Sequence, residues 1–253
     1  MESMNWAALS KPLIRLLGRL VLAGLVYAYL RSIGFYEFIL PEVNGLGTLI
    51  LLLGSIYAVM FAFVIFVIWG QFTDVDNFAI REASGLDDLL RFSQYLNADA
   101  SHAIRRAVMD YVQRVVKSEW QTLAERRKDP QTEKAFAVLT NAVIRAVPAN
   151  PAEAQMQARL IDIVRRVSEH RDDRLAKSLT QIPATLVRLL HLKAIALLLL
   201  VFVYPFHQAA IGFSCFALFA AVLFGANLVM MDTDNPFQGV CNVTPNAFLD
   251  LMG

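Results

Sequence analysis

The sequence predicts an all-α integral membrane protein, with four transmembrane helices and a helical cytoplasmic domain inserted between the second and third. Composition is the first observation: 57% of the 253 residues are hydrophobic and 18% are charged, against about 45–50% and about 25% in typical soluble domains. The second is charge placement, since Lys and Arg are absent between Arg31 and Arg81 and again after Lys193. The third is that no segment alternates polar and apolar residues between turn signals, as strands do. This balance also excludes disordered and nucleic-acid-binding chains.

Residues 1–70 are predicted to form an N-terminal membrane hairpin. The expected spans cover about 12–31 and 46–70, and the second contains no charged residue. Each is close to the roughly 20 residues that cross a bilayer. Arg15 and Arg19 lie near the start of the first span, where long side chains can reach the interface. No small-residue cleavage site follows Leu30, so we expect a retained span rather than a signal peptide.

Residues 71–182 are predicted to form a helical cytoplasmic region. The segment Thr73-Asp74-Val75-Asp76 resembles a capping box that would begin a new helix. A second helix is expected from about Ser101 to Arg127, because apolar residues recur there at three- and four-residue steps. A third covers roughly Gln131 to Ala146, and a fourth begins near Pro151.

Residues 183–231 are predicted to form a C-terminal membrane hairpin, followed by a tail at 232–253. Its spans cover about 186–204 and 209–231, separated by a break at Tyr204-Pro205. The two short connections between spans, Ser32 to Gly45 and the one at Pro205, contain no Lys or Arg. The positive-inside rule therefore places both termini and the central region in the cytoplasm.

Enzyme and metal motifs are not evident in the sequence, so we expect neither catalysis nor a cofactor. The four histidines are scattered, and the segment His170-Arg171-Asp172-Asp173 is interpreted as an exposed, ion-paired helix face. Trp120, next to Glu119, is interpreted as a core or interface residue. The two cysteines, Cys215 and Cys241, are expected to be ordinary thiols. The uncharged second span favours a pore with an apolar constriction over an ion-coupled pump, which buries ionisable groups.

Several short motifs resemble one known family. Trp69-Gly70-Gln71 closes the second span, Tyr111 precedes the pair Glu119-Trp120, and Asn235-Pro236-Phe237 follows the last span. Their order resembles bestrophin ion channels and, more closely, the bacterial bestrophin-like membrane domain family of unknown function.

This resemblance implies a homo-oligomer, pentameric in bestrophins, in a bacterial inner membrane, with a pore for small inorganic ions lined by the second span. Two registers for the apolar neck remain open: Leu51, Ser55 and Val59, or Leu52, Ile56 and Met60, with Phe63 beyond them. Selectivity is not inherited, because relatives conducting anions and cations share the fold. The competing hypothesis is a membrane-anchored interaction or signalling scaffold whose helical region binds a partner.

The tail after the last span offers one candidate metal site. Asp232 and Asp234 carry oxygens suited to calcium or another hard cation, with Gly239 nearby. Animal bestrophins continue with a run of acidic residues, whereas Gln238 and uncharged residues follow here. The alternative is a helix-terminating turn in which Asp and Asn side chains bond the backbone.

Overall fold

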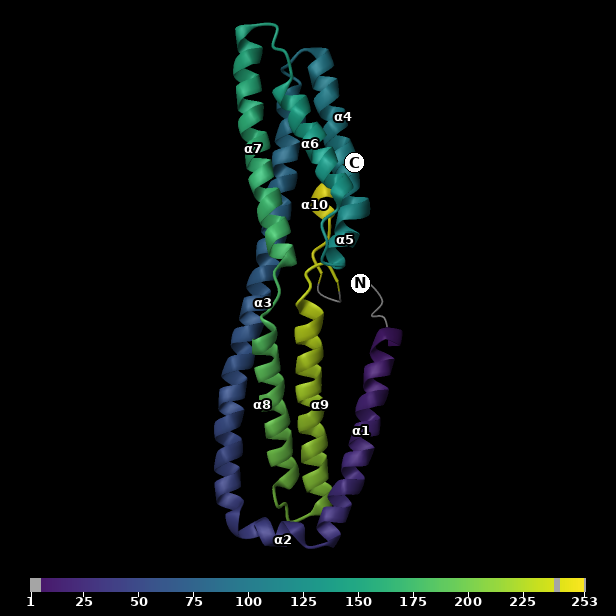
Figure 1. The fold of residues 1–253 in the computed structure, drawn as a ribbon, viewed down its shortest axis with the longest axis vertical. Coiled ribbons are helices and arrows are strands. Elements are labelled where there is room, and N and C mark those ends of the chain that lie inside the picture. Colours follow the sequence, from purple (N-terminus) through teal and green to yellow (C-terminus); the bar gives the residue numbers. More distant parts are fainter. Residues whose placement is uncertain (1–5, 239–241, 253) are drawn as a thin grey trace. The chain divides into compact units, whose positions relative to one another are not determined.

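A computed structural model describes residues 6–238 and 242–252, which contain helices and no strand. Gly239 and Cys241 lie outside the described residues. The elements in chain order (Figure 1) are α1 (Trp6–Ser32), α2 (Phe35–Ile39), the 3-10 turn η1 (Leu40–Glu42), α3 (Val43–Ser93), α4 (Ala98–Arg114), the π-helical turn η2 (Val115–Glu119), α5 (Trp120–Ala124), α6 (Pro130–Ile144), α7 (Pro151–Leu179), α8 (Ala184–Val203), α9 (Ala209–Thr233) and α10 (Asn246–Leu249). The all-α expectation is confirmed.

The chain divides into two compact units. The first unit comprises Met1–Phe66 and Ile182–Met231, and the second unit comprises Val67–Gln181 and Asp232–Gly253. Helix α3 contributes its first part to one unit and its remainder to the other.

Three helical stretches are long and apolar enough to cross a membrane, judged among the residues that the structure describes. They are Phe35–Ser93, Pro151–Val203 and Ala209–Thr233, and the expected spans at 46–70, 186–204 and 209–231 fall within them. The expected first span at 12–31 is not among the three. The total of four spans therefore stays a prediction.

Helix α3 continues without interruption through the segment that was expected to begin a new helix. The prediction of a capping box at Thr73 is wrong, since the Thr73 hydroxyl donates to the Trp69 carbonyl at 2.9 Å, one turn back in the same helix. Val75, Ala79 and Leu86 extend a buried stripe along α3 at helical spacing. Nothing in this stretch breaks the helix, and packing of the stripe stabilises its continuation.

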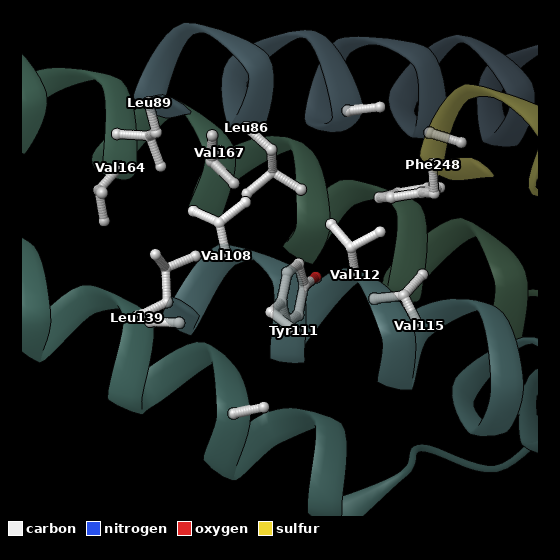
Figure 2. Packing of buried hydrophobic residues seen from close by; sticks show 14 of the residues in the cluster. Leu86, Leu89, Val108, Tyr111, Val112, Val115, Leu139, Val164, Val167 and Phe248 are labelled. Carbon is white, nitrogen blue, oxygen red and sulfur yellow. The ribbon is translucent and has the colours of Figure 1, made fainter. Parts of the chain in front are cut away.

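The second unit is held together by one apolar core. Leu86 from α3, Val108 from α4, Leu139 from α6, Val167 from α7 and Phe248 from α10 are all fully buried (Figure 2). At about 1.5–3 kcal/mol per buried aliphatic or aromatic side chain, this core is the main stabilising contribution to the unit.

Local capping explains where α6 and α7 begin. Pro130 and Pro151 each occupy a first-turn position, where a missing N–H costs nothing. The preceding Asp129 accepts hydrogen bonds from two backbone N–H groups of α6, and Asn150 accepts one from Glu153 in α7. The expected helices at Gln131–Ala146 and from Pro151 are confirmed to within about two residues.

In the first unit, the end of α1 is attached to the connection between α8 and α9. The Arg31 guanidinium donates to the carbonyls of Phe206 and His207 at 3.1 and 2.6 Å. The Tyr36 hydroxyl donates to the Phe202 carbonyl at 3.0 Å. A Cβ at Gly212 would lie 2.3 Å from the Tyr27 hydroxyl oxygen, so glycine is required for this close approach.

Candidate pore helix and buried ion-pair network

The part of α3 in the first unit has one packed face and one open face. Tyr57 and Val64 are 7% and 1% exposed. The opposite face carries Leu51, Val59 and Phe63 at 72%, 71% and 60% exposure. This open face is apolar along its length, which is typical of surfaces that meet lipid or another protein.

The two candidate neck registers differ in how much of each is exposed. Leu52 and Ile56 are 58% and 40% exposed, and Met60 is half-buried. The Sδ of Met60 lies 2.7 Å from Nζ of Lys193 in α8. Within this row, Leu52 and Ile56 are thus open, and Met60 is the member that packs within the chain.

The other register faces away from the chain throughout. Ser55, between Leu51 and Val59, is exposed, and its hydroxyl donates to the Leu51 carbonyl at 2.8 Å. That bond occupies the hydroxyl proton, so the exposed row offers no free hydrogen-bond donor. Beyond this unit, Trp69 is 59% exposed and stacks on Phe72, with Gln71 half-buried beside it.

A buried network of charged groups lies in the second unit, and it contains two of the motif residues. Glu82 of α3, Glu119 of η2, and Arg171 and Arg174 of α7 are each at most 1% exposed, as is Tyr111 of α4. We call these five residues the ion-pair network. Buried charges at this depth are tolerated only when paired and hydrogen-bonded.

Two arginines connect the two carboxylates of the network. Arg174 donates to both oxygens of Glu82 at 2.7 and 3.2 Å, and to Oε1 of Glu119 at 2.7 Å. Arg171 donates to Oε2 of Glu119 at 2.8 Å and to the Tyr111 hydroxyl at 3.0 Å. Tyr111 in turn donates to Glu82. Each carboxylate thus pairs with at least one guanidinium, and the network ties α3, α4, η2 and α7 together.

The electrostatics of the network favour its charged form. Burial and the carboxylate of Glu82 raise the pKa of Tyr111 well above its usual value, so the phenol stays protonated and donates. Burial alone would lower the pKa of Arg174, but Glu82 and Glu119 outweigh it and raise that pKa. Both arginines remain cations at any physiological pH.

The π-helical turn η2 brings Glu119 to the same side as Tyr111. In a regular α-helix a step of eight residues rotates a side chain by about 80° beyond two full turns. One residue added in a π-turn reduces this step to that of about seven residues, which nearly restores the original direction. The expected single helix from Ser101 to Arg127 is therefore wrong in detail, because it omits the turn that places Glu119.

The next residue, Trp120, anchors the C-terminal tail. Its indole N–H donates to the Val243 carbonyl at 2.9 Å. Its ring packs edge-on against Phe237 and Phe248, with centroids 5.1 and 5.7 Å away. The Arg174 guanidinium lies 5.5 Å from the Trp120 ring centroid. Trp120 thus joins the ion-pair network to the tail.

The Asn235-Pro236-Phe237 motif forms a turn against α5. The Asn235 amide donates to the Ala124 carbonyl at 2.8 Å, and its side-chain oxygen accepts from the Phe237 N–H at 3.1 Å. Pro236 and Phe237 are buried. This is the backbone-bonding turn that was the alternative to a metal site.

The carboxylates of Asp232 and Asp234, just before this motif, interact with other groups of the same chain. Asp234 accepts from Arg126 at 2.7 Å, and Asp232 is half-buried with an interaction of its own. Among the residues that the structure describes, no group of three or more His, Cys, Asp or Glu side chains is arranged to hold a metal ion. Calcium at Asp232 and Asp234 stays a prediction.

The sequence matches the Bestrophin-like domain over residues 40–248. This chain belongs to the bestrophin-like family. All the motif residues named above, from Trp69 to Phe237, lie within that match. A search of curated proteins finds no match.

Solved structures of bestrophin homologues share this fold. A bacterial bestrophin homologue from Klebsiella pneumoniae with a single substitution superposes with a TM-score of 0.71 at 13% identity, covering 96% of both chains. A second variant of that homologue superposes with a TM-score of 0.69 at 12% identity, covering 94% of this chain and 97% of the other. A crystal structure described only as that of a membrane protein superposes with a TM-score of 0.64 at 11% identity, covering 92% of this chain and 96% of the other.

Three members of the ion-pair network were missed by sequence analysis. The segment starting at His170 was interpreted as an exposed face, which is correct for Asp172 and Asp173 but wrong for Arg171. The spacing held a signal, because Arg171, Arg174 and Ser178 continue the apolar stripe of α7 at three- and four-residue steps. Glu82 had no comparable signal, since its partners come from helices far along the chain.

Proposed function

We propose that this bestrophin-like protein is a homo-oligomeric ion channel whose pore is lined by α3. The observation that carries the proposal is the open apolar face of α3, on which Leu51, Val59 and Phe63 stay exposed while the opposite face is packed. A ring of such helices around a common axis would form an apolar constriction, which gates ions by dewetting. Membership of the bestrophin-like family supports this assignment.

The exposure pattern favours one of the two neck registers. Leu51, Ser55 and Val59 point away from the rest of the chain, whereas Met60 is engaged with Lys193. The proposed neck is therefore the row of Leu51, Ser55 and Val59, with Phe63 continuing it by one turn.

We further propose a pentamer in the bacterial inner membrane, with four spans at about 12–31, 46–70, 186–204 and 209–231. The central region 71–182 would lie in the cytoplasm, because most of the Lys and Arg residues lie there. An even number of spans on each side of it would place both termini and the tail on the same side. A closed ring requires a head-to-tail interface between two different, complementary surfaces of the subunit, and the exposed flanks of α3 offer apolar surface for one.

Two measurements on purified protein test this function. The mass in detergent, after subtraction of the micelle, should be a multiple of 28.3 kDa, and fivefold for a pentamer. Liposomes containing the protein should pass small ions, and Val59→Ala should increase that flux several-fold by widening the neck. The matched control is Ile56→Ala on the adjacent face, which should leave the flux within about twofold.

Each alternative has its own outcome. A monomer without flux to any small ion would reject the channel and favour a membrane-anchored scaffold. A flux that responds to Ile56→Ala and not to Val59→Ala would keep the channel and reject the register.

A further inference from the structure

The first unit contains a cavity that neither the pore nor the ion-pair network uses. Its volume is about 440 Å³, and its lining residues come from α1, α8 and α9. This size is within the range of about 300–1,000 Å³ found for small-ligand sites. Most of its lining is apolar and includes Leu198, Phe216, Ala220 and Leu223.

Three polar side chains also line the cavity, one from each helix: Arg19, His191 and Asn227. The Asn227 amide donates to the Leu223 carbonyl at 2.9 Å, while its side-chain oxygen is buried with no hydrogen-bond partner among the described residues. Such an orphaned acceptor destabilises the fold unless a ligand donates to it. Nδ1 of His191 lies 2.8 Å from the Val187 carbonyl, which leaves Nε2 for another partner.

Among the described residues that line the cavity, Arg19 carries a positive charge and no side chain carries a negative one. Arg19 is exposed, and none of the residues around the cavity is acidic. The sequence has no Asp or Glu from residue 43 to 73 or from 174 to 231. A ligand bound beside Arg19 would therefore gain most from a negative charge.

The polar side chains gather toward one end of the cavity, whereas apolar side chains line its whole length. Arg31 fixes the end of α1 to the connection after α8. Arg19 lies roughly 12 residues, or about 18 Å of helix, before Arg31 in α1, and His191 lies about as far before the end of α8. Leu198 and Phe216 lie closer to the connection between α8 and α9. An occupant with a polar group at the Arg19 end and an apolar remainder fits this lining.

We propose that this cavity binds an anionic phospholipid with a hydroxyl-bearing headgroup, of the phosphatidylglycerol type. The phosphate would pair with Arg19, a headgroup hydroxyl would donate to Asn227, and one acyl chain would lie along Leu198 and Phe216. The proposal rests on the membrane location of α1 and not on ion conduction, so it stands or falls separately from the channel.

Native mass spectrometry of the full-length protein, purified with equal amounts of phosphatidylglycerol and phosphatidylcholine, tests the proposal. Wild type should retain the anionic lipid, at one per subunit, in preference to the neutral one. Arg19→Gln should weaken this binding about tenfold. The matched control is Arg188→Gln on α8, because Arg188 is exposed and does not line the cavity.

A second variant covers the case in which Arg19→Gln does not fold. Ala220→Leu fills part of the cavity without removing charge, and it should abolish retention while the protein stays monodisperse. Equal retention of both lipids, equal losses in the Arg19 and Arg188 variants, or full displacement by soluble glycerol phosphate would each overturn the proposal. Unchanged retention in the Ala220→Leu variant would do the same.

Discussion

The ion-pair network makes Arg174 one of the most consequential residues of the second unit. Arg174→Met removes three hydrogen bonds to Glu82 and Glu119, and it leaves two buried carboxylates with one remaining guanidinium. Removing one partner of a buried pair costs about 3–5 kcal/mol, because the other charge stays buried. For a chain of this size the thermal midpoint should fall by about 6–20 °C.

The matched control is Arg165→Met on the same helix. Arg165 pairs with Asp162 and Glu169 on the surface, where both acids are about half exposed. Such exposed pairs contribute about 0–1 kcal/mol. Both variants can be followed in detergent by tryptophan fluorescence in a protein in which Trp6 and Trp69 are replaced by Phe, so that the signal comes from Trp120, packed against Phe237 and Phe248.

A double variant separates the network from simple loss of volume. Combining Glu82→Gln with Arg174→Met removes one buried charge of each sign, so the loss should be smaller than the sum of the single losses. Strict additivity, or an Arg174→Met midpoint no lower than that of Arg165→Met, would refute a coupled network.

Three further predictions concern single contacts. Burial opposes ionisation of Asp129, but hydrogen bonds from hydroxyls and backbone N–H groups outweigh it and lower its pKa. The stabilisation that ionised Asp129 gives the fold is therefore complete above the unfolded pKa of about 3.9 and is lost as pH falls through the folded pKa. Asp129→Ala should lower the free energy of unfolding, measured by denaturation, by about 1 kcal/mol at pH 7 and by little near pH 2. Gly85→Ala places a Cβ 2.5 Å from the Val167 side chain and should cost about 1–3 kcal/mol, recovered in part by Val167→Ala in the same measurement. Trp120→Phe keeps the ring but loses the bond to Val243, and proteolysis of the tail should become faster than in wild type.

Sequence patterns predicted the parts of the fold that depend on local chemistry. Uncharged runs marked the apolar stretches, and Pro130 and Pro151 marked where α6 and α7 begin. The continuity of α3 past Thr73 was missed, because a polar cluster resembles a cap whether or not the helix has already begun.

The candidate site was only partly predictable, for a different reason. Tyr111 and Glu119 were identified through a family resemblance, but their partners Glu82 and Arg174 were not. These groups meet only after α3, α4 and α7 have packed, and the π-turn that aims Glu119 leaves no periodic mark in the sequence. The choice between the two neck registers stays a proposal, and it rests on the exposure of each face of α3.

The most direct test of the central claim is the blocking of ion flux by a charged, water-soluble thiol reagent. Cysteine is placed at Val59 in a protein lacking Cys215 and Cys241, reconstituted in liposomes. If the open face of α3 lines the pore, the reagent should abolish flux through Val59→Cys and leave Tyr57→Cys, on the packed face, unaffected. Persistent flux through a fully modified Val59→Cys protein, or block only of Tyr57→Cys, would contradict the claim.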